Sequence, residues 1–335
     1  MDIHHNMHSD KPHYYQQLTP AVVLDAIEQQ GFVPSGHLLA LNSYENRVYQ
    51  IGLDEGGFVI GKFYRQPRWS DAAILEEHRF TLELAEQELP IIAPIKDPQG
   101  QTLFHQQGFR FALYPRCGGH RPDLETAESL EQIGRLLGRM HAVGRQHTFE
   151  HRPRLTVEVF GREAIRNLQQ SALVPAETAH NFFAAAEAMV EAIEQQMMAL
   201  GSFPMQRLHG DFHAGNLLQN PQGLFVVDLD DCLLGPAVQD LWLLLDGDAE
   251  TMKRQLEPLL RGYDTFAYFD TSQLALIECL RGLRLLHYNA WIARRWDDPT
   301  FPHHFPWFAS PRHWEDQMID LRQQMERLQN PALTL

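Results

Sequence analysis

The chain has 335 residues, 44% of them hydrophobic, and a formal net charge of −15. This length and apolar content allow a substantial buried core and favour two lobes over one. Nucleic acid and anionic lipid are disfavoured as partners, because both would repel so acidic a chain before any specific contact formed.

Three sequence features favour a cytoplasmic protein that is not in a membrane. The most apolar run, residues 241–245, falls far short of the roughly 20 residues that a membrane span requires. Residues 1–17 lack the basic and apolar segments of a secretory signal. Cys117, Cys232 and Cys279 form neither a CxxC pair nor an even disulfide set, which suits a reducing compartment.

Short extended segments dominate the N-terminal third. Residues 1–18 are predicted to be a disordered tail, and residues 19–116 an ATP-binding lobe with a small mixed β-sheet. Gly56 and Gly57 favour a hairpin turn, and Ser70 is placed to cap a helix. The expected elements are a helix at 20–30, strands at 37–41, 47–53 and 58–64, a helix at 71–88, and strands at 101–104 and 109–114.

Helical periodicity dominates residues 117–335, which predicts a larger, mostly helical catalytic and substrate lobe and an α+β fold overall. Leu276, Leu280 and Leu283 recur at helical spacing, for example, and would face one core. The stretch 208–227 interrupts this pattern, as loops that carry chemistry commonly do on a rigid helical base. The expected helices cover 124–143, 182–200, 236–245 and 271–296.

The strongest chemical signal is LHGDFHAGNLL at 208–218, followed by VVDLDD at 226–231. Phosphoryl transfer requires an acceptor hydroxyl oriented in line and metal charge placed against the phosphates. Asp211 and Asn216 have the spacing of the proton-accepting Asp and the Mg²⁺-binding Asn of protein-kinase loops. A hairpin then brings Asp228 to the end of an apolar strand, as a second catalytic carboxylate and a metal ligand.

Each of these fragments has a plainer interpretation when it is taken alone. HGD can be a turn, Asn216 a helix cap and VVDLDD a strand leaving the core, since short motifs are frequent by chance. Their combination at this spacing favours a kinase site. Asp230 and Asp231 stay open between a supporting role and a capping or solvated one. His213 is interpreted as a structural histidine.

An ATP-binding pair is predicted in the N-terminal lobe. Lys62, in the strand FVIGKFY, corresponds to the phosphate-pairing lysine of kinase strands. Its partner should be an acid on the inward face of the following helix. An advance of about 100° per residue puts Glu77 on that face, and Glu76 and Glu83 on the opposite one. A single acid on an apolar face needs a partner, which supports the match of Glu77 with Lys62.

The loop LNSYENRVY, between the first two strands, occupies the place of a glycine-rich phosphate loop but contains no glycine. Backbone N–H groups and the Ser43 hydroxyl can still donate to phosphate. Residues 56–62 spell G-x-x-x-x-G-K, but Phe63 follows where a Walker A loop requires Ser or Thr. We therefore reject a Walker A loop.

With these motifs the chain resembles the aminoglycoside phosphotransferase and choline kinase superfamily, whose hallmark is an HGDxHxxN loop followed by an acidic strand end. NSYENRVYQ, ILEEH and VQDLW extend the resemblance along most of the chain. It implies a protein-kinase-like bilobal fold, with Asp211 as the proton acceptor and Asn216 and Asp228 as ligands of Mg²⁺. It also implies that Ser43 contacts ATP.

Within this superfamily the chain looks most like the bacterial stress-response protein kinases, and that resemblance implies a monomeric, cytoplasmic serine/threonine protein kinase that uses ATP and Mg²⁺, acts in the stress response and protects against cell death. Gly210 stands where eukaryotic kinases have the HRD arginine, so a phosphorylated activation loop is not expected. A kinase of small alcohols, such as amino alcohols, sugars or aminoglycosides, is the alternative. Composition does not decide between them. Arg281, Arg284, Trp291 and Arg295 form either a stripe for an acidic peptide or a solvated helix face.

Overall fold

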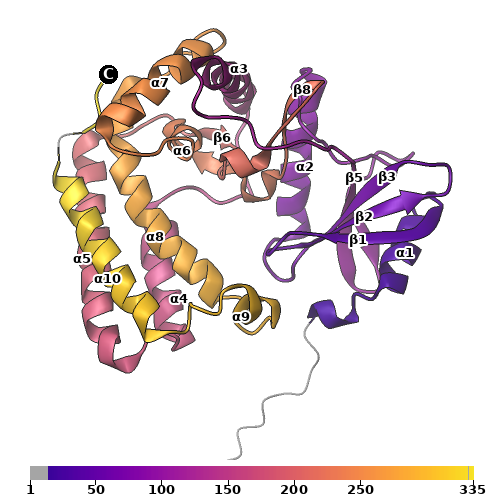
Figure 1. Ribbon diagram of the computed structural model, residues 1–335, viewed down its shortest axis with the longest axis horizontal. Helices are drawn as coiled ribbons and strands as arrows, with labels where there is room; N and C mark the ends of the chain where they lie inside the picture. Colours follow the sequence, from indigo (N-terminus) through magenta and orange to yellow (C-terminus); the bar gives the residue numbers. More distant parts are fainter. Residues whose placement is uncertain (1–13, 331) are drawn as a thin grey trace, which may run out of the picture. The chain divides into compact units, whose positions relative to one another are not determined.

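The computed structural model describes residues 14–330 and 332–335 (Figure 1). They divide into two compact units. The first holds the described residues up to Trp69 and Ile95–Arg116, and the second holds Ser70–Pro94 and Cys117–Leu335. No helix within the described residues is long and apolar enough to cross a membrane. The division into functional lobes between residues 116 and 117 stays a prediction.

The first unit is built on a five-stranded sheet with the strand order β1-β2-β3-β5-β4. All its pairings are antiparallel, so the expectation of a mixed sheet is wrong in this detail. Short hairpins join three of the four neighbouring pairs, and a hairpin makes its strands antiparallel. The elements are η1 (Tyr14–Gln17), α1 (Pro20–Glu28), β1 (Pro34–Leu41), β2 (Arg47–Leu53), β3 (Phe58–Phe63), β4 (Phe104–Gln106) and β5 (Phe109–Pro115).

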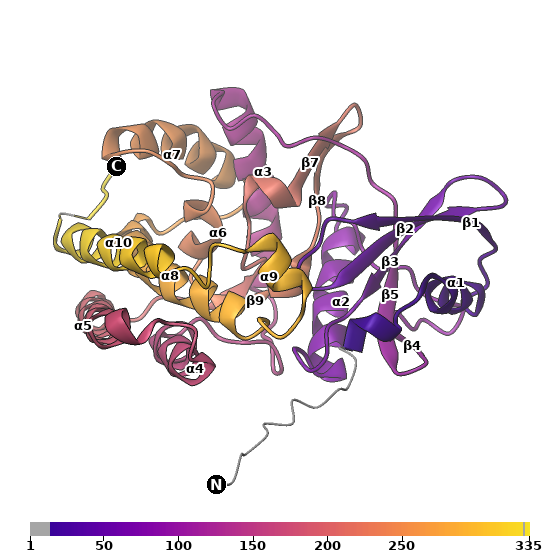
Figure 2. The same cartoon turned by 60° about the horizontal axis from the view of Figure 1, so that its bottom comes forward.

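One face of this sheet is the core of the first unit. Phe63 of β3 stacks on Phe111 of β5, with ring centroids 5.1 Å apart. Helix α1 lies against the sheet and contributes Val23 and Ile27 to the same cluster (Figure 2). Burial of each such side chain contributes about 1.5–3 kcal/mol, so the hydrophobic effect holds α1 on this face.

The predicted tail, residues 1–18, is wrong at its C-terminal end. Residues 1–13 lie outside the described residues, but Tyr14–Gln17 form a short 3-10 helix. Tyr15 is buried and donates a hydrogen bond of 3.0 Å to the carbonyl of Phe63, while the Arg47 guanidinium lies over its ring. An aromatic side chain with a backbone partner explains why this polar segment is ordered.

The strand predicted at 101–104 begins later, at Phe104. The side chain of Asp97 accepts hydrogen bonds from the backbone N–H groups of Gln99 and Gln101, at 2.9 and 2.7 Å. Such an aspartate-centred turn competes with a strand ladder for the backbone donors. The paired strand is therefore displaced toward the β4–β5 turn.

Helices make up most of the second unit. In Figures 1 and 2, α8 lies between α4 and α10, α10 packs along α5, and α3 packs on α7. The helices predicted at 124–143, 182–200 and 271–296 are present, the last beginning as a 3-10 turn. The helix predicted at 236–245 is shorter, and α4, α7, α9 and α10 were not predicted. The bounds are α2 (Asp71–Glu86), α3 (Ala127–Gly144), a π-helix (Glu158–Arg162), α4 (Glu163–Ser171), α5 (Ala176–Leu200), α6 (Val238–Trp242), α7 (Ala249–Tyr263), η5 (Thr271–Leu276), α8 (Ile277–Ala293), α9 (Thr300–His304) and α10 (Pro311–Gln329).

Helices α3 and α7 approach so closely that glycine is required between them. A Cβ atom on Gly134 would lie 1.9 Å from the carbonyl oxygen of Leu259, and one on Gly138 would lie 2.5 Å from that of Tyr263. Gly262 of α7 meets the backbone of α3 in the same way. This contact fixes α3, which supplies His141 to the functional site.

Candidate functional site

The stretch 206–235 has no α-helix, only the short 3-10 turns η3 (Ala214–Asn216) and η4 (Leu229–Asp231), and it forms two small ladders in the second unit. β6 (Gln206–Leu208) pairs with β9 (Leu233–Gly235), and β7 (Leu217–Asn220) pairs with β8 (Gly223–Val226). Just before β7, the carbonyl of Asn216 accepts a hydrogen bond of 3.0 Å from the N–H of Val227. Asn216 and Asp228 are therefore brought to the same end of the β7–β8 hairpin.

Two further hydrogen bonds attach the loop of Asp211 to this end of the hairpin. Nε2 of His209 lies 3.0 Å from the carbonyl oxygen of Val227, and its Nδ1 accepts from the N–H of Asp211, so the proton is on Nε2. The amide nitrogen of Asn216 donates to the carbonyl of Asp211 at 2.9 Å. The Asn216 amide oxygen accepts no hydrogen bond from any described residue.

Asp240 of α6 is the anchor of the loop, and the sequence analysis missed it. Its side chain is fully buried and accepts hydrogen bonds of 2.8 Å from the N–H groups of both His209 and Gly210. Nε2 of His141 lies 3.1 Å from the same carboxylate, and burial lowers the pKa of this histidine, so it is a neutral donor. The neighbouring Gln239 donates to the carbonyl of Gly210 at 2.9 Å. The sequence does carry a signal for this anchor, because Gln239 and Asp240 are two polar residues within the otherwise apolar run VQDLW.

Residue 210 must be glycine because of its backbone conformation and its close approach to a neighbouring segment. Its φ of +85° lies in the left-handed region, and a Cβ atom there would lie 2.1 Å from the carbonyl oxygen of Asp231. An arginine at this position, as in the HRD motif, would meet both obstacles. The departure from the eukaryotic motif therefore has a local structural reason.

The carboxylate of Asp211 is held between two basic side chains. Nη1 of Arg284, on α8, lies 3.0 Å from Oδ1, and Nε2 of His213 lies 3.3 Å from Oδ2. Burial alone would raise the pKa of Asp211, but the hydrogen bond from His213 and the charge of Arg284 outweigh it and hold the pKa well below its usual range. Oδ1 is nevertheless buried and accepts no hydrogen bond of good geometry from any described residue.

His213 has a more specific place than a structural histidine of the core. Its Nδ1 accepts the N–H of Gly215 at 2.8 Å, which leaves the proton on Nε2, where it faces Asp211. The side chain is 37% exposed. His213 therefore orients the Asp211 carboxylate from the solvent side of the loop.

The segment after β8 leaves the hairpin through an unusual backbone conformation. Asp228 has φ +60° and ψ 68°, which non-glycine residues adopt rarely and aspartate more readily than most. Asp230 is buried, and both its carbonyl and that of Cys232 accept hydrogen bonds from the buried side chain of Arg152. Asp231 supplies the carbonyl that faces Gly210. These contacts are made by backbone carbonyls, so the roles of the Asp230 and Asp231 side chains stay open.

Both faces of α2 carry buried acidic side chains. Glu77 is buried as predicted, and it is near enough to Cys232 to contribute to the raised pKa of that thiol, of which burial is the main cause. Glu76 is buried too: its carboxylate accepts the N–H groups of residues 150–152 at 2.6–2.9 Å. Glu83 pairs with Arg207 at 2.7 Å. The loop of residues 150–152 thus packs on the face opposite Glu77, a contact that helical periodicity alone does not reveal.

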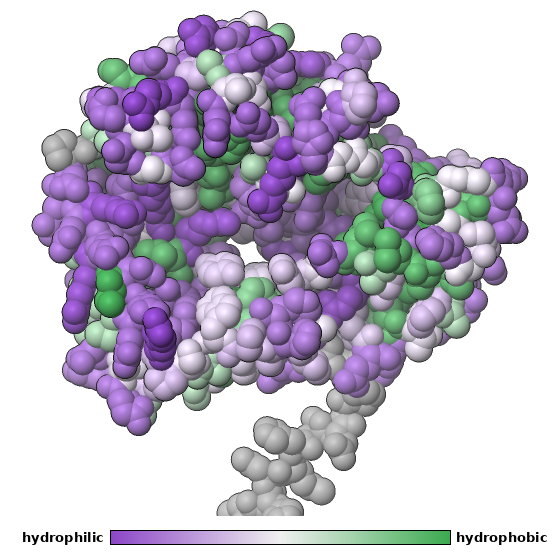
Figure 3. All heavy atoms as spheres, viewed as in Figure 1, coloured by the Kyte–Doolittle hydropathy of each residue, from purple (hydrophilic) through white to green (hydrophobic). Residues whose placement is uncertain are grey.

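Lys62 and Ser43 belong to the first unit. The strand register places Lys62 beside Val48 of β2 and Ala112 of β5, on the face opposite the aromatic core. Leu41 of β1 continues this row, and apolar residues gather on the surface of this unit in Figure 3. Ser43 is half-buried in the β1–β2 loop. A row with one cation among apolar side chains can accept a flat ring and a phosphate.

Comparison with known proteins identifies the family of this site. Residues 37–277 match the phosphotransferase enzyme family. The chain belongs to this family. Its fold is protein-kinase-like, with one sheet-based unit and a mostly helical remainder, and its activity is phosphoryl transfer.

Curated relatives align along nearly the whole chain. Stress response kinase A of Escherichia coli O157:H7 is 41% identical over 321 residues, which cover 96% of this chain and 97% of the relative. The serine/threonine protein kinase RdoA of Salmonella typhimurium strain LT2 is 40% identical over 327 residues and 98% of both chains. Among solved structures, amicoumacin kinase hAmiN in complex with AMP-PNP, Ca²⁺ and Ami has a TM-score of 0.67 and 17% identity, over 88% of this chain and 93% of that one, which shows the fold.

Proposed function

We propose that this phosphotransferase transfers the γ-phosphate of ATP to serine or threonine hydroxyls of a protein, with Mg²⁺, as a cytoplasmic monomer acting in the stress response and in protection from cell death. The observation that carries the proposal is the convergence of Asp211, Asn216 and Asp228 at one end of the β7–β8 hairpin. The names of the two curated relatives support a protein acceptor and a stress role.

Asp211 is the proposed proton acceptor. Its low pKa keeps it ionised at physiological pH, and its Oδ1 atom, which Arg284 contacts, accepts no hydrogen bond of good geometry from any described residue. A carboxylate at this point orients the acceptor oxygen toward the γ-phosphorus and takes its proton as the new P–O bond forms. Phosphoryl transfer depends mostly on positioning, so a weakly basic carboxylate is adequate.

Asn216 and Asp228 are the proposed metal ligands. Among the described residues, no group of three His, Cys, Asp or Glu side chains is arranged to hold a metal ion. Mg²⁺ in such enzymes is commonly held by one or two protein oxygens together with phosphate oxygens and water. The Asn216 amide fits this donor set, because its nitrogen is committed to Asp211 and its oxygen is not. Bound Mg²⁺ would neutralise charge on the transferring phosphate.

The nucleotide contacts are proposed for Lys62, Glu77 and Ser43. Lys62 projects from a regular strand on an apolar sheet face, which suits an adenine ring flanked by a phosphate-pairing cation. Glu77 is the proposed partner of this lysine, and Ser43 a donor from the β1–β2 loop. That loop is held by Arg65, whose side chain donates to the carbonyl of Glu45 at 2.9 Å.

A small-molecule acceptor is the second candidate, because the solved structure with the same fold is named for an antibiotic kinase. The two candidates separate in one assay. Purified protein is incubated with γ-³²P-ATP and Mg²⁺ and either a panel of proteins or a panel of amino alcohols, sugars and aminoglycosides. We expect label on seryl or threonyl residues, identified by acid hydrolysis and phosphoamino-acid separation. Label confined to a metabolite would overturn the protein-kinase proposal.

A further inference from the structure

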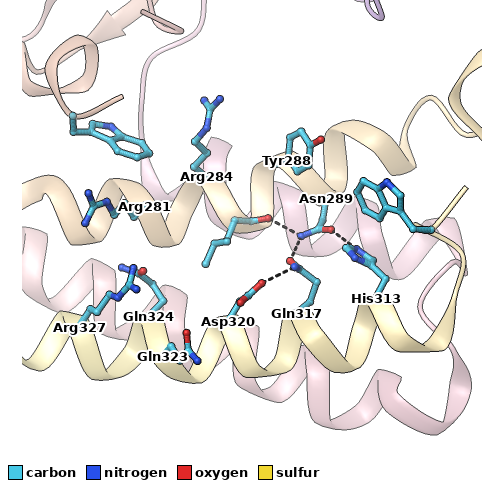
Figure 4. Close-up of a pocket in the computed structure, with 13 residues that line it drawn as sticks. Arg281, Arg284, Tyr288, Asn289, His313, Gln317, Asp320, Gln323, Gln324 and Arg327 are labelled. Atoms are coloured by element: carbon cyan, nitrogen blue, oxygen red, sulfur yellow. Dashed lines mark hydrogen bonds between the residues drawn. The ribbon is translucent and has the colours of Figure 1, made fainter. Parts of the chain in front are cut away.

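A pocket of about 690 Å³ opens between α8 and α10 in the second unit (Figure 4). Arg281, Arg284 and Tyr288 line it from α8 at helical spacing, and Arg327 and His313 line it from opposite ends of α10. Polar residues dominate the surface of this unit around α5, α8 and α10 in Figure 3. The pocket itself is lined by both polar and aromatic side chains, with its arginines toward one end.

Two contacts connect this pocket to the proposed catalytic loop. Arg284 lines the pocket and also reaches Oδ1 of Asp211 at 3.0 Å. Trp242, another lining residue, donates its indole N–H to Gln239 at 3.1 Å, and Gln239 holds the carbonyl of Gly210. Arg284 thus lies at the edge of the pocket, and its guanidinium, which points away from α10 in Figure 4, contacts the proposed proton acceptor.

The charges of the lining favour an anionic occupant. Three arginines and a single carboxylate, Asp320, line the pocket, and Asp320 accepts a hydrogen bond of 2.9 Å from Gln317. Arg281 is paired with Glu278 at 2.7 Å, whereas Arg327 makes no ion pair with any described residue. An amine-rich ligand would need several carboxylates here. A carboxylate, in contrast, meets guanidinium donors.

The floor of the pocket is ordered by a chain of hydrogen bonds that ends on Asp320 (Figure 4). Gln317 donates to Asp320, the buried Asn289 donates to Gln317 at 2.6 Å, and His313 Nε2 lies 3.0 Å from the Asn289 amide oxygen. Burial lowers the pKa of His313 to about 4, so it is the neutral donor of this last contact. The floor therefore adds no positive charge, and recognition of an anion falls to the arginines.

The Arg284 contact also covers the atom that the acceptor must reach. Oδ1 of Asp211 is buried, although the Asp211 side chain as a whole is 25% exposed. Arg284 is 43% exposed and touches Oδ1 without the geometry of a good hydrogen bond. A second carboxylate can offer the planar guanidinium a two-pronged pair, which is stronger than such a contact. A substrate carboxylate can therefore compete with Asp211 for Arg284.

We propose that this pocket receives an acidic segment beside the acceptor serine or threonine, and that Arg284 is the specificity residue that binds its carboxylate and thereby uncovers Asp211. The inference rests on the proposed function and adds the substrate class. Once Arg284 moves, the acceptor hydroxyl donates to Oδ1. Its oxygen then bonds to the γ-phosphorus, the bond to the ADP oxygen breaks with its electron pair on ADP, and the hydroxyl proton passes to Asp211.

The test uses the full chain and three serine peptides of equal length, in which the residues beside the serine are Asp, Asn or Lys. We expect kcat/KM for the Asp peptide to exceed that for the Asn peptide by about 10- to 100-fold, the range for a charge-assisted hydrogen bond. The Lys peptide should be the poorest. Equal kcat/KM for all three peptides, with measurable transfer, would overturn the inference and leave the proposed function intact.

Substitutions of Arg284 test whether its side chain produces the preference for the Asp peptide over the Asn peptide. Arg284→Gln should reduce the Asp-over-Asn ratio to near one, chiefly through a higher KM for the Asp peptide. Arg284→Lys should retain part of the preference, because it keeps the positive charge but loses the planar, two-pronged hydrogen bonding of the guanidinium. Arg312→Gln, on an exposed part of α10, is the matched control and should retain the full ratio. A full ratio in Arg284→Gln would contradict the inference.

A further arm of the assay uses free L-serine. It tests whether the acceptor is a free amino acid with its own carboxylate or a serine within a peptide or protein. Labelling of serine but of no peptide or protein would contradict both the inference and the proposed protein acceptor. Labelling of protein seryl residues in non-acidic contexts would contradict the inference alone.

Discussion

Strand β3 and the loop 209–216 both carry proposed active-site residues, but they position them by different means. Lys62 is placed by a regular ladder, in which its neighbours on both sides follow from strand register. Asp211 is placed by irregular backbone that depends on hydrogen bonds to Asp240 and Gln239, roughly 30 residues downstream. Many sequences with the same alternation of side chains between the two sheet faces could form this strand. The loop tolerates few, because each of its contacts is made by a particular side chain.

This difference predicts how each region responds to substitution. In the strand, a change at Lys62 removes a ligand contact and leaves the scaffold. In the loop, an anchor such as Asp240 touches no ligand itself, but a change there displaces the residues that position Asp211. The following predictions are ordered from the largest expected effect to the smallest.

Asp211→Asn should reduce kcat for phosphoryl transfer by about 10²- to 10⁴-fold, the range for loss of a positioned proton acceptor. Binding of ATP, measured by isothermal titration calorimetry, should change little. Asn keeps the shape of the side chain, so circular dichroism should match the parent protein. Full turnover in this variant would remove Asp211 from its proposed role.

Asp240→Asn should lower the free energy of unfolding by about 2–4 kcal/mol, because at least one buried backbone N–H loses its acceptor. Transfer should fall with it, since His209 and Gly210 position Asp211. Urea denaturation measures the first effect. Asp246→Asn, at an exposed position, is the control. Unchanged stability would show that the loop is held by other contacts.

Lys62→Ala should reduce kcat/KM for ATP by about 10- to 100-fold, as expected for loss of a charged hydrogen bond to phosphate. The sheet is held by backbone pairing, so its circular dichroism should not change. Lys253→Ala, on the surface of α7, serves as the control. If Lys62→Ala unfolded the protein, the contrast between strand and loop would be wrong.

His313→Gln should make the melting temperature less sensitive to pH between about 6.5 and 4. Burial lowers the folded-state pKa of His313 to about 4, so in this window the unfolded chain binds the proton more tightly. Acid therefore destabilises the parent protein through this residue, and the variant should lose that part of the decline. The effect should be small, because the side chain is only partly buried. His180→Gln is the control, and identical pH profiles for all three proteins would contradict the assignment.

The sequence predicted those features that depend on short-range pattern. β2 and the N-terminal cap of α2 by Ser70 were correct, because alternation and a capping hydroxyl act over a few residues. The presence of the 208–231 segment followed from its motif spacing. Asp240 as the loop anchor and the burial of Glu76 were not predictable in this way. Both depend on contacts with residues far along the chain, which one sequence does not reveal.

The central claim is that Asp211, Asn216 and Asp228 converge on the metal–nucleotide complex. A crystal structure with Mg²⁺ and AMP-PNP tests it most directly. We predict a Mg²⁺ ion about 2.0–2.1 Å from the amide oxygen of Asn216 and a carboxylate oxygen of Asp228, with Lys62 on a phosphate and Asp211 facing the γ-phosphate. Nucleotide bound elsewhere, or metal held by other residues, would contradict the account.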